Sequence, residues 1–293
     1  MFRNLRFYRV EGAWPDSDEA LSENLGKAAF EPCGPFTERS SGFAPIAPET
    51  SEVLARRVNG ADLFRLRVQS RVLPHAVVNE ELEARTEEFR ERTGDAPRGR
   101  EKRRLKAEVR DELMPKALLR SDRTWAYFDL KEKLLAIDAA QEAAAERFLR
   151  RLQAANELLQ FRPLQFKQPF VDLLNGIFLG GAPETFAVGG ECRMQDAVDK
   201  ASVVRWVNFD LGDRSIRDHV AGGMRLTHLG VIYDNIMSCV VDENGVFTKI
   251  RFLGVDDDGE SPGDAQARMD AEFVLLTGTL RRLLGDVGKL LGR

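Results

Sequence analysis

The sequence of 293 residues has few of the residues that build disulfide frameworks and metal centres. It contains only three cysteines, Cys33, Cys192 and Cys239, which are far apart and form no C-x-x-C motif. An odd number of widely spaced cysteines argues against a disulfide framework and against a structural zinc site. We therefore expect small buried thiols in a reduced, cytoplasmic protein.

Catalytic and phosphate-binding motifs are missing as well. Histidine occurs only as His75, His219 and His228, with no H-x-x-x-H or H-E-x-x-H spacing. The glycine-rich segments at 178–183, 188–191 and 221–224 lack the context that phosphate binding needs, and we expect turns there. No G-x-S-x-G motif is present. The sequence therefore predicts no catalytic residues and no cofactor, which argues against a nuclease or an ATPase.

One acidic loop is a candidate cation site and can be compared with an EF-hand. It carries Asp256, Asp257, Asp258 and Glu260. With Gly259 at the sixth position of an EF-hand loop, the first position is Gly254 and the twelfth is Ala265. Neither supplies a ligand oxygen from its side chain. We expect a solvated turn and no metal site.

Long apolar runs are absent too. The N-terminal segment MFRNLRFYRVEG alternates apolar and charged residues and has neither an apolar core nor a cleavage site, so we expect no signal peptide. The longest apolar runs fall far short of the ~20 residues that cross a bilayer, so no membrane contact is expected. Apolar residues make up 43% of the chain and charged residues 31%, which is typical of a globular protein with a charged surface.

The residues outside 76–119 predict a mixture of strands and helices. Alternation indicates strands at 4–10 and 63–73, and a β-hairpin at 124–130 and 133–139. Helices are expected at 16–30 and 139–159, with turns at 31–50 and a proline-punctuated connection at 161–170. Further along, helical pieces are expected at 170–181 and 191–199, and strands at 202–211, 230–245 and 246–254 with an Asn-Gly turn at 242–245. Two final helices should cover 265–276 and the leucine-rich segment from Leu280 to Leu291.

Residues 76–119 are dense in Glu, Arg and Lys. Val78, Leu82 and Phe89 share one helical face, TGDAPRG at 93–99 is a turn signal, and Leu105, Val109 and Leu113 are four residues apart. This pattern predicts a helical hairpin with a narrow apolar seam that projects from the body of the protein.

The charges on the second of these helices are separated by sign. At about 100° per residue, Lys102, Arg103, Lys106 and Arg110 fall along one flank and the acids along the other. None of the four has an acid three or four residues away, whereas Arg104 has Glu101 and Glu108. Two interpretations remain open. The glutamates of the first helix neutralise this flank, or the flank faces phosphates and gives salt-sensitive affinity for DNA.

The order of several motifs resembles a known family. These motifs are FRNLRFYRV at the start, AAFEPCG (28–34), GFAP (42–45), RVLPHAVVNEEL (71–82), ELMPKAL (112–118), TWAYFD (124–129), DENGVFTKIRFLG (242–254) and MDAEFVLLTGTLRRLL (269–284). Together they resemble the bacterial recombination-associated RdgC family. The resemblance implies a nucleoid-associated, ring-shaped homodimer that encircles duplex DNA without sequence preference and restrains the RecA recombinase. Such a ring would place positive charge inward and would reconcile DNA binding with the net charge of -4.

The resemblance also implies two sets of site residues. The position that closes the ring against the partner matches Leu118, followed by Leu119; packing of both inside one chain is the alternative. The DNA-contacting stretch matches 205–209, which departs from the family's lysines and has only Arg205 and Asn208 as candidates. Further charge would come from Arg214, Arg217 and Arg225. Strand alternation predicts that Val203, Val207 and Phe209 are buried and that Trp206 and Asn208 lie on the other face.

We therefore expect an α+β chain in three parts, assembled as a ring-shaped homodimer. The parts are a central α/β domain (1–75 with 120–165), a helical-hairpin tip (76–119) and an α+β base domain (166–293). The predicted function is non-specific binding of double-stranded DNA that limits RecA-mediated strand exchange, with single-stranded DNA left open as a further ligand. The alternative is a protein–protein regulatory module that acts on the recombination machinery directly.

Overall fold

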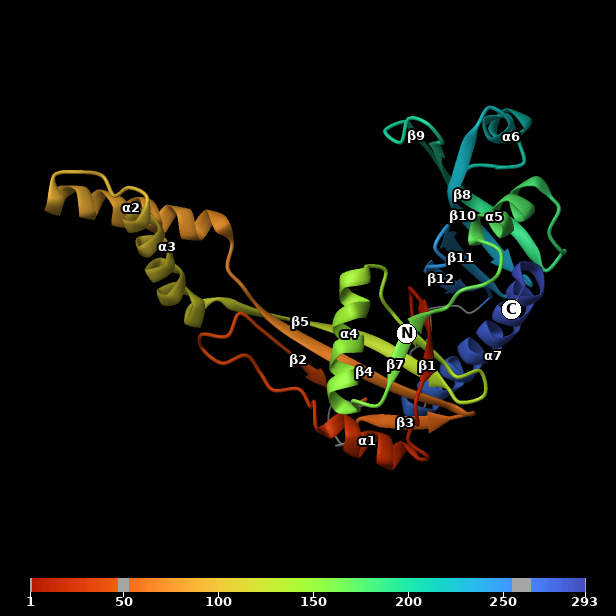
Figure 1. Ribbon diagram of the computed structural model, residues 1–293, viewed down its shortest axis with the longest axis horizontal. Coiled ribbons are helices and arrows are strands. Elements are labelled where there is room, and N and C mark those ends of the chain that lie inside the picture. Colours follow the sequence, from red (N-terminus) through yellow and green to blue (C-terminus); the bar gives the residue numbers. More distant parts are fainter. Residues whose placement is uncertain (1, 47–52, 255–264, 293) are drawn as a thin grey trace.

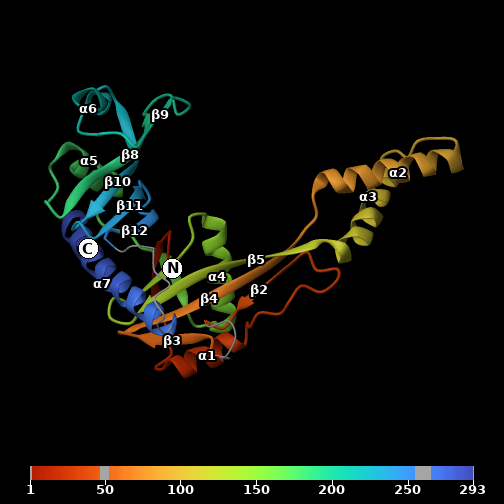
Figure 2. The ribbon, with the colours of Figure 1, turned by 180° about the vertical axis from the view of Figure 1, so that it is seen from behind.

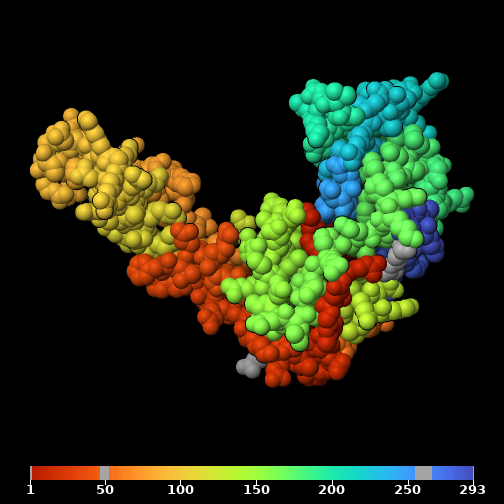
Figure 3. Space-filling view, in the orientation of Figure 1, coloured from red at the N-terminus to blue at the C-terminus, as the bar shows by residue number. Residues whose placement is uncertain are grey.

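The computed structural model describes residues 2–46, 53–254 and 265–292. It is a mixed α/β structure built on two antiparallel sheets. In Figure 1 the molecule has the shape of an arch, with helices α2 (His75–Thr93) and α3 (Arg100–Leu113) at one end and the second sheet at the other. The space-filling view shows a broad hollow between these two ends (Figure 3).

The central sheet forms the middle of the arch. It consists of β1 (Arg6–Glu11), β2 (Arg39–Phe43), β3 (Ala55–Val58), β4 (Ala61–Val72), β5 (Leu118–Asp129), β6 (Leu134–Ile137) and β7 (Gln160–Pro163). The order is β2-β4-β5-β6-β1-β7, and β3 also pairs with β4. Strand β7 begins at Gln160 and runs into the segment 161–170, for which the sequence predicted only a connection. The edge pairing of Arg162 with Arg9 makes it a strand.

Two helices cover one face of the central sheet. They are α1 (Asp18–Gly26) and α4 (Glu142–Ala155). The Ser17 hydroxyl caps α1 by accepting a hydrogen bond from the Ala20 amide at 3.2 Å, and acidic residues fill the first turn. Phe148 of α4 packs on Phe43 and Phe64 of the sheet. The alternation of apolar side chains along β4 thus supplies one core of the molecule.

The tip consists of the predicted helical hairpin. Strands β4 and β5 pair along their whole length, from Ala61 opposite Asp129 to Val72 opposite Leu118, and lead directly into it. Helix α2 ends at Gly94, whose φ of 82° lies in the left-handed region that glycine adopts without strain. Val78, Leu82 and Val109 are buried between the helices. A short 3₁₀ turn, η1 (Met114–Lys116), joins α3 to β5.

The base sheet lies at the other end of the arch. Its strands are β8 (Phe186–Asp196), β9 (Val203–Val207), β10 (Met224–Tyr233), β11 (Met237–Asp242) and β12 (Phe247–Phe252), in the order β12-β11-β10-β8-β9. The accompanying helices are α5 (Phe170–Leu179), α6 (Arg214–Ala221) and α7 (Ala265–Leu291). In Figures 1 and 2, α5 and α7 lie on the outer side of this sheet, so its other face opens toward the hollow.

Several predicted elements of this region are wrong. Residues 188–191 and 191–199, expected as a turn and a helix, lie mostly in β8, where Cys192 and Met194 are buried and pair with both neighbouring strands. The two predicted final helices are one. Helix α7 runs without a break from Ala265 to Leu291, and the buried Thr277 hydroxyl in its middle donates to the Phe273 carbonyl at 2.9 Å.

The cysteines are buried and unpaired, as predicted. Burial raises the pKa of the Cys192 thiol to about 11 and that of Cys239 to about 12, so neither is a reactive thiolate near neutral pH. Among the described helices, none has both the length and the apolar character needed to span a bilayer.

Candidate nucleic-acid interface

Helix α3 carries unpaired cations on the tip. Lys102, Arg103 and Lys106 are exposed and form no ion pair within the described parts of the chain. We call these three residues the tip stripe. Arg104, which lies beside them in the sequence, is bound to Glu108 at 2.9 Å, as its spacing predicted. The basic run therefore divides into one internally paired arginine and three available cations.

The acids of α2 do not form ion pairs with the tip stripe in the described structure. An ion pair that crosses the hairpin joins Arg85 of α2 to Glu112 of α3 at 2.7 Å. In this pair α2 supplies the cation and α3 supplies the acid. A hydrogen bond with Glu81 and the charge of Glu112 raise the pKa of Arg85. No contact in the described structure therefore supports the interpretation that the glutamates of α2 neutralise this flank.

Arg110, the fourth predicted cation, has a different environment. Its guanidinium bonds the carboxylate of Glu38, in the loop before β2. The two residues are 72 positions apart, so helical spacing could not reveal the pair. Arg110 is therefore less available to an external anion than the tip stripe.

Strand β9 buries the face opposite to the predicted one. Val203, Val207 and Phe209 are 41%, 47% and 50% exposed, while Trp206 is half-buried and packs on His219 with ring centroids 5.2 Å apart. The reason is the pairing of this edge strand with β8, which sets Trp206 opposite the buried Cys192. Arg205 therefore shares the exposed face, where it lies 3.9 Å from Glu191.

The open face of the base sheet carries a groove of about 430 Å³. The ionisable side chains that line it, named here the base groove, are Glu191, Arg193, Arg205, His228 and Lys249. Glu191 holds Lys249 at 2.6 Å, and Arg193 has no ion pair in the described structure. Burial lowers the pKa of His228, which favours its neutral form. The base groove thus has three cations, Arg193, Arg205 and Lys249, and one carboxylate, Glu191.

Arg193 and Lys249 were not among the predicted site residues. A prediction of β8 as a strand would have placed Arg193 beside Arg205.

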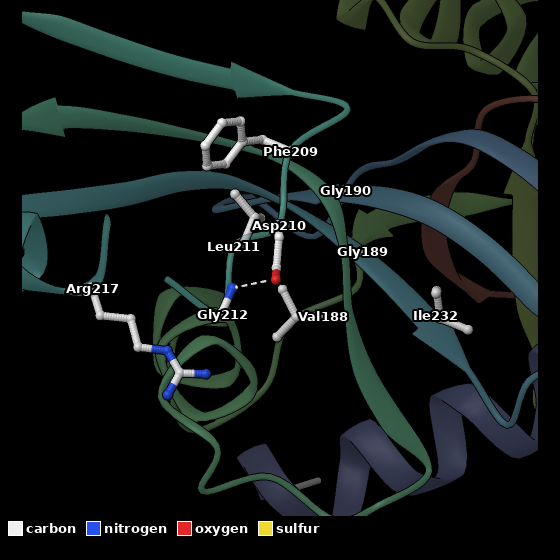
Figure 4. Close-up of a pocket in the computed structure, with 9 residues that line it drawn as sticks. All are labelled: Val188, Gly189, Gly190, Phe209, Asp210, Leu211, Gly212, Arg217 and Ile232. Carbon is white, nitrogen blue, oxygen red and sulfur yellow. Dashed lines mark hydrogen bonds between the residues drawn. The ribbon is translucent and has the colours of Figure 1, made fainter. Parts of the chain in front are cut away.

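A second pocket, of about 320 Å³, lies beside the end of β9 (Figure 4). Asn208 leaves the strand with a φ of 54°, and Phe209 and Arg217 line the pocket. The Arg217 Nε atom is buried without a hydrogen-bond partner. Of the other predicted cations, Arg214 is exposed, whereas Arg225 is bound to Glu243 at 2.6 Å. The structure thus places Arg205 in the base groove and Arg217 in the second pocket, and leaves Arg225 neutralised.

Comparison with known proteins identifies the family. A family model described as "Putative exonuclease, RdgC" matches residues 1–293. The chain belongs to the RdgC family. A relative named recombination-associated protein RdgC, from Xanthomonas campestris pv. campestris (strain B100), is 30% identical over 287 residues, which cover 96% of this chain and 94% of the relative. The protein of the same name from Cupriavidus necator is 32% identical over 297 residues, covering 99% and 98%. The predicted family membership is confirmed.

The two RdgC descriptions point to different activities, one to a nuclease and the other to recombination. Metal-dependent nucleases need clustered carboxylates or histidines to hold their ions. In the described ranges, no group of three or more His, Cys, Asp or Glu side chains could hold a metal ion. The acidic loop with Asp256, Asp257, Asp258 and Glu260 lies outside the described residues.

The predicted ring-closing residues of this RdgC protein are on the surface. Leu118 is 79% exposed and Leu119 is 49% exposed, at the start of β5 where it leaves the tip. The alternative that both pack inside one chain is wrong, because β5 continues past the covered part of the central sheet. Phe36, in the loop before β2, is 72% exposed.

Proposed function

We propose that this RdgC-family protein binds double-stranded DNA without sequence preference, as a ring-shaped homodimer, and thereby limits RecA-mediated strand exchange. The observation that carries the proposal is the segregation of charge. The chain has 43 basic and 47 acidic residues, yet the tip stripe has no ionic partner in the described structure. Unpaired cations of this kind bind phosphates by releasing counterions, which requires no base contacts.

The arch supports the proposed assembly. Two copies related by a two-fold axis would enclose one opening if they met at both ends of the arch. Leu118 and Leu119 are suited to one of these contacts because exposed leucines gain free energy when a partner buries them. The division into central, tip and base domains belongs to the same proposal, as does a cytoplasmic, nucleoid-associated location.

The mechanism that we propose has no chemical step. The protein occupies duplex DNA and so withholds it from the recombinase. Incubation of the protein with linear duplex and Mg²⁺ should leave the DNA intact. Shortened strands that depend on the protein would show that the nuclease description applies to this chain.

Salt dependence tests the proposal. Fluorescence anisotropy of a labelled duplex, measured from 50 to 200 mM salt, should give a log–log slope of about -0.9 for each phosphate neutralised on duplex DNA. The triple variant Lys102→Ala/Arg103→Ala/Lys106→Ala should reduce the magnitude of this slope by up to about 2.7 for each protomer that contacts the duplex, since it removes as many as three contacts per protomer. Arg104→Ala is the matched control, because Glu108 already pairs with Arg104. An affinity that does not change with salt would refute the proposal.

The alternative is a protein–protein module that acts on the recombination machinery. The exposed Phe36, Leu118 and Leu119 favour it, because apolar side chains of this size also form protein interfaces. The same triple variant separates the two functions. If DNA affinity stays unchanged while inhibition of RecA strand exchange disappears, the protein acts through a protein partner.

A further inference from the structure

An arginine cluster lies on the central sheet, away from both the tip stripe and the base groove. Arg65 and Arg67 of β4 and Arg123 of β5 share the face of Leu63 and Tyr127, which is covered by α7. In Figure 2, α7 lies in front of the sheet near β3, and β4 and β5 continue from there to the tip. We call these three residues the arginine platform.

Two aromatic rings support the platform. The Arg65 guanidinium carbon lies 5.1 Å from the centre of the Trp125 ring, and that of Arg67 lies 4.5 Å from the centre of the Phe30 ring. Stacking on a ring fixes the plane of a guanidinium and leaves its N–H edge free for hydrogen bonds. Because the rings are already covered by guanidiniums, these ring faces are not open to nucleobases.

The hydrogen bonds of the platform are incomplete. Arg65 is only 7% exposed, and the Nε atoms of Arg65 and Arg67 are both buried without a hydrogen-bond partner. Arg67 does donate from Nη2 to the Ser121 hydroxyl at 3.1 Å. Both Nε atoms are buried, so an external anion would meet the outer nitrogens of Arg67 and the exposed guanidinium of Arg123 instead.

No carboxylate balances these charges in the described parts of the chain. Asp122, next to Arg123 in sequence, points to the opposite face and is bound to Arg120 at 3.1 Å. Asp129, on the same face as the platform, is bound to Arg281. Burial, followed by the charges of Arg123 and Arg67, lowers the pKa of Arg65.

The three arginines also repel one another. Arg67 and Arg123 are directly opposite in the strand register, and like charges in such a pair destabilise a sheet. A surface that served packing alone would be more stable with one of them replaced. The cluster therefore fits an external anion better than a purely structural role.

We infer that the arginine platform is an additional contact for the DNA backbone, in which Arg67 and Arg123 bind phosphodiester groups and the buried Arg65 adds positive potential behind them. This inference rests on the proposed function. Neighbouring strand partners have Cβ atoms about 5 Å apart, which lets two guanidinium forks reach adjacent phosphates of one DNA strand. The contact is independent of sequence, because phosphates carry no base identity.

The double variant Arg67→Ala/Arg123→Ala tests the inference. For each protomer that contacts the duplex, it should reduce the magnitude of the log–log salt slope by about 1.8, as expected for two lost phosphate contacts, and weaken binding at 0.1 M salt by roughly 60-fold. Arg120→Ala is the matched control. Arg120 lies on the same strand, is equally basic, faces the other way and is bound to Asp122, so its removal should leave the slope unchanged.

The single variant Arg123→Ala keeps the inference testable if the double variant misfolds. Arg123 is exposed and its removal leaves the Arg67–Phe30 stacking in place. It should reduce the slope by about 0.9 for each protomer that contacts the duplex. If the unaltered protein binds with a steep slope but both variants keep that slope, the platform does not contact DNA while the proposed function stands. If the unaltered protein shows no salt-dependent binding, both proposals fail.

Discussion

The ion pair between Arg281 and Asp129 should anchor α7 to the central sheet. The Asp129 side chain is 5% exposed, and its Oδ2 atom accepts a hydrogen bond from the Arg281 Nε atom at 2.5 Å. Arg281 also donates from Nη2 to the carbonyls of Asn59 and Gly60, at 3.1 and 3.3 Å. We predict that Arg281→Ala substantially destabilises the protein, because it leaves a buried carboxylate without its cation.

The magnitude follows from the burial of the two partners. Removing one member of a buried pair costs about 3–5 kcal/mol. The Arg281 side chain is 24% exposed, and Asp129 keeps hydrogen bonds from the amides of Lys131 and Glu132. We therefore expect a loss of about 2–3 kcal/mol, which lowers the melting temperature of a chain of this size by roughly 3–5 °C.

Arg282 provides an unusually close control. It is the next residue of α7, and it pairs with Asp234 at 3.2 Å with side chains that are 55% and 40% exposed. Exposed pairs contribute at most about 1 kcal/mol, so Arg282→Ala should shift the melting temperature by no more than about 2 °C. Both variants are compared with the parent by calorimetry at one pH and one salt concentration. Equal shifts for the two variants would show that burial of the Asp129 pair does not matter.

Three further predictions concern other parts of the arch. Leu118→Asp should abolish self-association in sedimentation velocity while leaving the melting temperature within about 2 °C, because an exposed side chain contributes little to the fold; a dimer that persists would argue against the ring contact. Gly42→Ala should lower the melting temperature by several degrees, since an added Cβ would overlap the Ala29 carbonyl, whereas Gly26→Ala meets open space and should not; equal melting temperatures would contradict this packing. Hydrogen bonds from Lys289 and Tyr233 lower the pKa of Asp286, so its stabilising contribution is complete above about pH 4 and disappears as the pH falls through the lowered value; Asp286→Asn should therefore weaken the acid dependence of unfolding, and an unchanged profile would refute this.

Local patterns predicted the tip well. The apolar seam of α2 and α3, the turn at Gly94 and the Arg104–Glu108 pair all depend on residues close in sequence. Helical spacing describes such features fully, because a helix satisfies its own backbone. The family resemblance, in turn, depended on motif order along the whole chain and needed no structure.

The failures concern contacts between distant residues. The covered face of β9 is decided by its neighbour β8, and Arg110 is neutralised from a loop far away in sequence. The arginine platform is also invisible in the sequence, since Arg67 and Arg123 meet only when β4 pairs with β5. The pattern of a single sequence gives the period at which apolar residues recur in a segment. It does not show which strand will pair with that segment, because this depends on the assembled sheet.

The position of α7 has a consequence for the order in which the arch is completed during synthesis. Residues 265–291 leave the ribosome after both sheets, yet α7 reaches the central sheet through Arg281 and Phe273 and the base sheet through Asp286. A nascent chain can form either sheet earlier, since each has its own strand pairing. The bridge between Leu5 and Phe247 already joins the two sheets before α7 is made, so docking of the last helix completes the angle between the two ends of the arch and any surface that depends on both.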